Sequence, residues 1–142
     1  MTSTAETIVV GVDGSGSSVQ ALRWAARQAQ LTGATVHAVT AWTYPVHYGL
    51  GGYHDLADEA GKVLSAAVRE ALGSQPAVPV RESVVAGHAA QALLDAAIGA
   101  QLLVLGSHGY GGVTGALLGS ISQHCVQHSP CPVVIVRGEP RG

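Results

Sequence analysis

Short runs of apolar residues recur along the chain, and polar or helix-like segments separate them. Continuous apolar runs of this length are typical of strands that are buried on both faces of a sheet. Glycine, proline or serine follows within a few residues of each run, and these residues mark turns. The pattern therefore predicts five strands, at residues 7–12, 35–42, 80–85, 102–105 and 132–136.

Between the strands, apolar residues recur every three or four positions, as they do on one side of a helix. The first such segment spans residues 19–31. Ser17 or Ser18 is suited to cap its start, and Gly33 is suited to end it. The same spacing predicts helices at residues 55–72, 89–98 and 115–127. Residues 43–53, which are rich in Tyr, Gly and His, are predicted to form a loop that could serve as a lid.

Strands and helices thus alternate along the chain. Alternation of this kind predicts an α/β fold, a doubly wound five-stranded parallel sheet with helices on both faces, which is Rossmann-like. A length of 142 residues suits a single domain, residues 1–142. Ligands of such sheets bind beyond the carboxyl ends of the strands, where the strand order reverses. Loops suited to a ligand follow two strands, at residues 12–15 and 106–109, and they meet if the first and fourth strands are neighbours.

The second of these loops belongs to a glycine-rich stretch. Residues 106–120 read GSHGYGGVTGALLGS, between a predicted strand and a predicted helix. Unpaired backbone N–H groups and the positive end of a helix dipole come together there, so a phosphate is a natural ligand. The alternative is that the glycines form only a flexible loop before a helix. The stretch lacks the lysine of a P-loop, so rapid phosphoryl transfer would lack its usual cation.

Composition and charge narrow the possible functions. Charged residues are 11% of the chain, the net charge is −2 and Lys62 is the single lysine, so we expect no nucleic-acid partner. No apolar run approaches the roughly 20 residues of a membrane span, and residues 1–7 do not resemble a secretory signal. Cys125 and Cys131 are interpreted as free thiols, with a redox pair as the alternative. Together these features favour a cytoplasmic protein with no membrane partner.

Two further patterns have alternative interpretations. His124 and His128 are four residues apart on a predicted helix, so the pair could chelate zinc. No glutamate follows His124 as in the H-E-x-x-H motif, and we expect packing or solvent-exposed histidines and no metal site. Residues 11–16 look briefly like a dinucleotide-binding fingerprint, but they do not match G-x-G-x-x-G.

One spacing in the glycine-rich stretch is more specific. It consists of Gly, two residues, Gly, nine residues, and Gly followed by Ser or Thr. It falls on Gly106, Gly109, Gly119 and Ser120. The flanking segments IVVGVDGS at 8–15 and HSPCPVVIV at 128–136 keep the matching order. Over nearly its whole length the chain resembles the universal stress protein family, in the branch that carries this nucleotide-binding motif.

The resemblance implies a strand order of 3-2-1-4-5, with ATP and Mg²⁺ bound where the first and fourth strands meet. It also implies a homodimer that is joined through the last strand, Val133 to Val136. By position, Asp13 would lie near the ribose or phosphates or would bind Mg²⁺, and the backbone of Val39, Thr40 and Ala41 would face the adenine. The remaining cofactor-binding residues would be Val12, Gly106, His108, Gly109, Gly119, Ser120 and Ile121.

Three positions depart from what is common in the family. Gln101 stands where an acidic residue is common, and His88 stands where proline is often found. His108 stands where a basic residue, often arginine, is frequent, and a neutral imidazole offers a phosphate less charge than arginine does. None of these changes falls on the glycines or the serine of the motif.

The function expected from the sequence is that of an ATP-binding universal stress protein. It would be a nucleotide-dependent regulatory or binding module in the stress response, with an unidentified protein partner. We expect no catalytic residue and at most slow ATP hydrolysis, because no general base or arginine finger faces the glycine loop.

Two alternatives stay open. One is a stress protein that binds no nucleotide and acts through protein partners. The other is an adenylate-forming enzyme of the related nucleotide-binding α/β fold, whose motifs S-G-G-x-D-S or H-x-G-H stand near the first strand. This chain has DGSGSS there, at residues 13–18.

Overall fold

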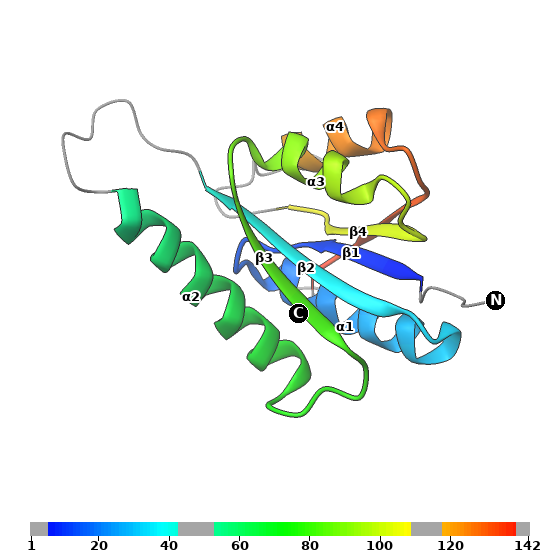
Figure 1. The fold of residues 1–142 in the computed structure, drawn as a ribbon. Coiled ribbons are helices and arrows are strands. Elements are labelled where there is room, and N and C mark those ends of the chain that lie inside the picture. Colours follow the sequence, from blue (N-terminus) through cyan, green and yellow to red (C-terminus); the bar gives the residue numbers. More distant parts are fainter. Residues whose placement is uncertain (1–5, 43–52, 109–117, 139–142) are drawn as a thin grey trace.

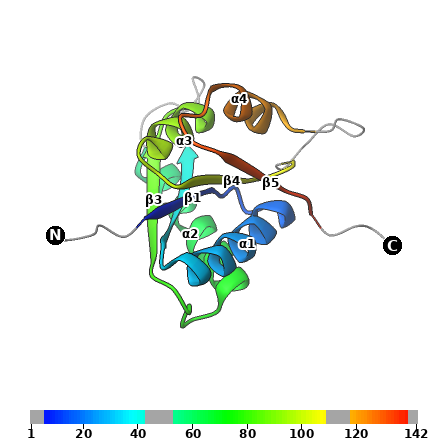
Figure 2. The same ribbon diagram turned by 90° about the vertical axis from the view of Figure 1, so that its right-hand side faces the viewer.

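The computed structural model describes residues 6–42, 53–108 and 118–138. Five parallel strands form one sheet in the order β3-β2-β1-β4-β5, and helices cover both of its faces (Figures 1 and 2). The predicted α/β fold and strand order are confirmed. The elements are β1 (Thr7–Gly11), α1 (Gly16–Thr32), β2 (Thr35–Trp42), α2 (Tyr53–Leu72), β3 (Val80–Ala86), α3 (Ala89–Ala97), β4 (Leu102–Gly106), α4 (Ser120–His128) and β5 (Val133–Val136).

The sheet separates two hydrophobic cores, and Figure 2 shows α1 and α2 on one side of it with α3 and α4 on the other. Successive residues of a strand point to opposite faces. On β1, Ile8 and Val10 therefore pack into the core under α1 and α2, whereas Val9 packs into the core under α3 and α4. All three side chains have no exposed surface. This burial on both faces explains why the strands read as continuous apolar runs.

The start of α1 differs from the sequence prediction. Ser15 caps the helix, and its hydroxyl oxygen accepts a hydrogen bond from the Ser18 backbone N–H at 3.3 Å. The expected caps, Ser17 and Ser18, lie inside the first turn instead. The cause is a tight turn after β1, in which Gly14 has a φ of +85° and the Asp13 carboxylate accepts from the Ser15 N–H at 2.8 Å. The predicted end at Gly33, with a φ of +77°, is confirmed.

The start of α4 also differs from the prediction of residues 115–127. The helix begins at Ser120 with Gly119 as its N-cap, and residues 115–117 lie outside the described residues. The Gly119 N–H donates to the Ser107 carbonyl at 2.8 Å. That bond ties the N-terminus of α4 to the end of β4, so the helix starts beside the strand that precedes it in the sheet.

Most of the predicted loop at residues 43–53 lies outside the described residues, so its role as a lid stays a prediction. The described chain resumes with α2 at Tyr53, two residues before the predicted start. Among the helices that the structure describes, none has the length and apolar character needed to cross a membrane.

Candidate functional site

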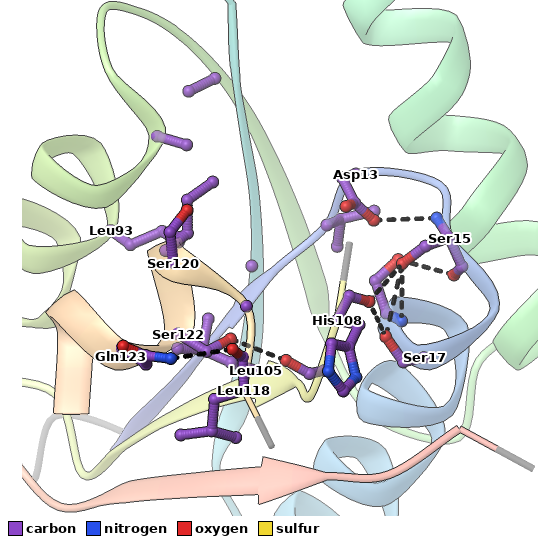
Figure 3. A pocket seen from close by; sticks show the side chains of 18 of the residues that line it. Asp13, Ser15, Ser17, Leu93, Leu105, His108, Leu118, Ser120, Ser122 and Gln123 are labelled. Carbon is purple, nitrogen blue, oxygen red and sulfur yellow. Dashed lines mark hydrogen bonds between the residues drawn. The ribbon is translucent and has the colours of Figure 1, made fainter. Parts of the chain in front are cut away.

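A cavity of about 430 Å³ opens at the carboxyl ends of β1, β2 and β4, on the side of the sheet that carries α3 and α4 (Figure 3). Its volume falls in the range of small-molecule sites. This position is also where ligands bind in parallel sheets, because β1 is the strand at which the order reverses. The lining residues are Gly11, Val12, Asp13, Ser15, Ser17, Ser18, Val39, Ala41, Ala89, Leu93, Leu105, Gly106, His108, Leu118, Gly119, Ser120, Ile121, Ser122 and Gln123.

One wall of the cavity is apolar. Strand β2 contributes Val39 and Ala41, and the first half of α3 contributes Ala89 and Leu93. Gly11 of β1 allows Leu93 and Leu105 to pack close to its backbone, because a Cβ atom there would lie 2.8 Å from a methyl group of Leu105 and 2.9 Å from one of Leu93. An apolar wall beside exposed strand ends suits a flat, weakly polar ring system.

A second wall is polar and is fastened by hydrogen bonds. The Ser17 hydroxyl donates to the carbonyl oxygen of His108, and the Ser15 hydroxyl lies 3.5 Å from the same oxygen. Figure 3 shows Asp13, Ser15, Ser17 and His108 gathered on this side of the cavity. These bonds join the first turn of α1 to the segment after β4, so the ends of the two central strands are held together.

The N-terminus of α4 forms the third part of the lining. The first bond inside the helix runs from the Gln123 N–H to the Gly119 carbonyl at 2.9 Å. The backbone N–H groups of Ser120, Ile121 and Ser122 therefore have no acceptor within the helix. Such N–H groups, with the helix dipole behind them, favour an anion. The Ser120 side chain is exposed there and adds a hydroxyl donor.

Gly106 has a packing role that its place in the glycine motif did not suggest. A Cβ atom at this position would meet the Ser17 side chain and would lie 2.8 Å from the Ser17 carbonyl carbon. The Gly106 carbonyl also accepts from the Ser122 hydroxyl at 2.8 Å. The glycine therefore allows α1 to approach the end of β4, and its carbonyl holds the first turn of α4.

We expect the substitution Gly106→Ala to lower the free energy of unfolding by about 1–3 kcal/mol, because the added methyl group overlaps the backbone of α1. Thermal unfolding of the ligand-free protein measures the effect. Gly16→Ala is the matched control, since no atom lies within 4 Å of a Cβ built at Gly16. Equal melting temperatures for the two variants would contradict the packing role of Gly106.

The structure brings together most of the residues that the sequence predicted for the site. Thr40 is not among the lining residues; it is 7% exposed, and strand alternation turns its side chain away from the face that Val39 and Ala41 share. Gly109 lies outside the described residues. The predicted residues that line the cavity are Val12, Asp13, Val39, Ala41, Gly106, His108, Gly119, Ser120 and Ile121.

The sequence prediction did not include the serines of α1 or the wall from α3. Ser15 and Ser17 stand in the DGSGSS segment, where Ser17 is expected to cap the helix and neither serine is expected to line a ligand site. Ala89 and Leu93 are four residues apart, so they share one face of α3. That spacing indicates a buried face but does not distinguish a core contact from a cavity wall.

The charges around the cavity are few. Among the described lining residues, Asp13 is the one acidic side chain, His108 is the one histidine, and neither lysine nor arginine is present. Asp13 is exposed and His108 is half-buried. A phosphate in the cavity would therefore depend on backbone N–H groups, hydroxyls and any cation that arrives with it or lies next to it.

A serine and a histidine also lie close together far from the cavity, on β2 and β3. The distance between His37 Nε2 and Ser83 Oγ is 2.7 Å, and the Arg81 guanidinium lies 3.1 Å from His37 Nδ1. Arginine can only donate, so Nδ1 accepts and the proton of the neutral ring sits on Nε2. Burial and the Arg81 charge both lower the pKa of His37. The ring therefore donates to Ser83 and does not activate it as a nucleophile.

The cysteines and the histidine pair show no sign of redox or metal chemistry in the described residues. Cys125 and Cys131 are both free, and burial raises the pKa of the Cys125 thiol, which disfavours the reactive thiolate. The rings of His124 and His128 lie 4.5 Å apart. Within the part of the chain that the structure describes, no three His, Cys, Asp or Glu side chains are grouped as a metal site needs.

Comparison with known proteins identifies one family. Residues 4–137 match the family model described as the Universal stress protein family. The universal stress protein Rv2005c of Mycobacterium tuberculosis is 38% identical over 132 residues, which cover 92% of this chain and 45% of that protein. The chain thus spans about half the length of the curated relatives it matches.

Solved structures agree with the fold. The universal stress protein UspA from Lactobacillus plantarum is 22% identical with a TM-score of 0.78, and the match covers 96% of this chain and 100% of that one. A universal stress protein in complex with cAMP is 30% identical with a TM-score of 0.62, again over 96% of this chain and 100% of that one.

Proposed function

Because the chain belongs to the universal stress protein family, we propose that it binds an adenine nucleotide and acts as a nucleotide-dependent regulatory or binding module in the stress response. The observation that carries the proposal is the joining of two kinds of surface in one cavity. An apolar wall from β2 and α3 faces the same space as the unpaired N–H groups of α4. A nucleotide carries the matching pair of groups, a flat base and a phosphate.

The cAMP complex of a relative 30% identical to the chain supports an adenine nucleotide as the ligand. In our proposal the base lies against Val39 and Ala41, and the phosphates lie at Ser120 and Ile121. The motif Gly106, Gly109, Gly119 and Ser120 supports the same orientation. Gly109 belongs to this proposal through the motif alone, since it lies outside the described residues.

We propose ATP as the physiological ligand, with Mg²⁺ bound to its phosphates. The donor set fits such a cation, because Mg²⁺ commonly takes one or two carboxylates together with phosphate oxygens and water. Asp13 is the one carboxylate in the described lining, and one of its oxygens accepts from the Ser15 N–H. Bound Mg²⁺ would offset phosphate charge. Hydrolysis is expected to be slow, because the described lining has no lysine or arginine to stabilise the charge of a leaving phosphate.

Strand β5 supports the proposed homodimer. It lies at an edge of the sheet, and its residues Val133 to Val136 are all partly exposed. An edge strand of this kind presents unpaired backbone groups and apolar side chains that a second copy can cover.

The two free cysteines favour action in the cytoplasm, where thiols stay reduced.

Calorimetric titration with Mg-ATP, AMP and cAMP tests the proposal. We expect saturable binding with one site per chain. At a ligand concentration of 100 times the Kd, the folded protein should gain roughly 2.7 kcal/mol of stability, which thermal unfolding reports. No heat and no shift in melting temperature at millimolar nucleotide would contradict the proposal and would favour a stress protein that acts only through protein partners. Release of pyrophosphate with an acceptor would favour the adenylate-forming alternative.

A further inference from the structure

We infer that Arg137, which is outside the cavity lining, is a phosphate-binding residue that raises the affinity of the site for ligands with several phosphates. The inference rests on the proposed nucleotide function and deepens it. It predicts a preference for ATP over AMP and assigns that preference to one side chain. The glycine motif does not include Arg137, which directly follows the last predicted strand at residues 132–136.

The pairing of β4 and β5 places Arg137 at the correct edge of the sheet. Gly106 is the register partner of Val136, and the Ser107 N–H donates to the Val136 carbonyl at 2.9 Å. Strand β5 is therefore still paired with β4 at Val136, the residue before Arg137. Ser107 also accepts from the N–H of Gly119. Arg137 thus lies beside the residue that holds the N-terminus of α4.

Side chains along β5 alternate between the two faces of the sheet, and this alternation shows on which face the Arg137 side chain lies. Val134 and Val136 pack against the core under α1 and α2, whereas Val133 and Ile135 pack against the core under α3 and α4. Arg137 follows the second pair. The next residue, Gly138, confirms the alternation, because a Cβ atom built there would lie 3.6 Å from Ser17 Cβ on α1. Arg137 therefore emerges on the face that carries α4 and the cavity.

The cavity lining lacks the positive charge that a nucleotide's phosphates need, and Arg137 can supply it. The described lining of the cavity holds one carboxylate and no lysine or arginine, although a nucleotide brings several negative charges. Arg137 is exposed. Within the described residues the one ion pair joins Lys62 and Glu59, so no carboxylate there holds the Arg137 guanidinium. Gly106 and Gly119 line the cavity, so a guanidinium on a long side chain that starts beside them is suited to bind two oxygens of a phosphate there at once.

Titration of the wild type and of Arg137→Gln with adenosine, AMP and Mg-ATP tests the inference. We expect the variant to bind ATP about tenfold more weakly, because it loses a charge-assisted hydrogen bond. Its affinity for adenosine should be unchanged. Arg137→Lys keeps the positive charge and should retain most of the ATP affinity. Arg27→Gln is the matched control, since Arg27 is also exposed but lies in the second half of α1.

The outcomes separate the inference from the proposal beneath it. If Arg137→Gln binds ATP with the wild-type Kd and binds AMP with the wild-type Kd, nucleotide binding stands and the proposed role of Arg137 is wrong. If Arg27→Gln weakens ATP binding as much as Arg137→Gln does, the effect is one of net charge and the assigned position is also wrong. If the wild type binds none of the three ligands, the proposed function itself fails.

Discussion

The variant Ala41→Trp is expected to bind adenine nucleotides about a hundredfold more weakly than the wild type, because an indole ring takes the space proposed for the base. Ala41 lies at the end of β2 and lines the apolar wall. It is half-buried, so the larger side chain can enter the cavity without displacing the core. Calorimetric titration with AMP measures the loss.

A tryptophan at an unrelated position serves as the control. Ala66 is exposed on α2, and α2 covers the opposite face of the sheet from the cavity. Ala66→Trp should bind AMP with the wild-type Kd. Both variants should unfold at nearly the wild-type temperature in the absence of ligand. An unchanged Kd for Ala41→Trp would show that the base does not lie against β2.

The largest expected effect on stability comes from the core of α1. Leu22 has no exposed surface and packs against the sheet. We expect Leu22→Ala to lower the free energy of unfolding by about 2–5 kcal/mol, because it removes buried methyl groups and leaves a cavity that the surroundings fill only in part. Urea-induced unfolding measures the change through its midpoint.

The same helix provides the matched control. Leu31 is also in α1, but 83% of its surface is exposed. Leu31→Ala should change the free energy of unfolding by less than about 0.5 kcal/mol. Because the two substitutions delete the same atoms from the same helix, their difference isolates burial. Similar midpoints for the two variants would contradict the position of α1 against the sheet.

The fold could be predicted from the sequence because its signals are local and agree with one another. The apolar runs mark strands that are buried on both faces, and the left-handed glycine Gly33 ends α1 where the pattern stops. The carboxyl ends of parallel strands meet at one edge, so the glycine-rich stretch and Asp13 could be assigned to one site. The alternation of elements predicts the parallel sheet without any detail of packing, whereas the strand order that makes β1 and β4 neighbours is implied by the resemblance to the family.

Details that depend on contacts between distant elements could not be predicted in this way. The start of α4 depends on the bond from Gly119 to Ser107, and helical spacing alone does not show it. The packing role of Gly106 also depends on a contact between distant elements and could not be predicted from the sequence. The resemblance assigns it to the cofactor site, but its missing side chain makes room for Ser17. The place of Arg137 likewise follows from the pairing of β5 with β4.

These contacts connect the site to the core. Ser17 of α1 donates to the carbonyl of His108, and Ser122 of α4 donates to that of Gly106. Both helices are thereby held to the segment that leaves β4. A ligand that contacts α4 and β1 together would bridge two elements that are each hydrogen-bonded to β4, so binding should stabilise the whole domain and not only its loops.

Mapping the bound nucleotide onto the chain tests the central claim most directly. Nitrogen–proton NMR correlation spectra recorded during titration with AMP report each backbone amide separately. We predict that the largest shifts fall on Val12, Val39, Ala41, Ser120 and Ile121, which line the cavity, and that the amides of α2 barely change. Saturable shifts that cluster on α2 and β3, or no shift at millimolar AMP, would contradict an adenine-nucleotide site at the carboxyl ends of the strands.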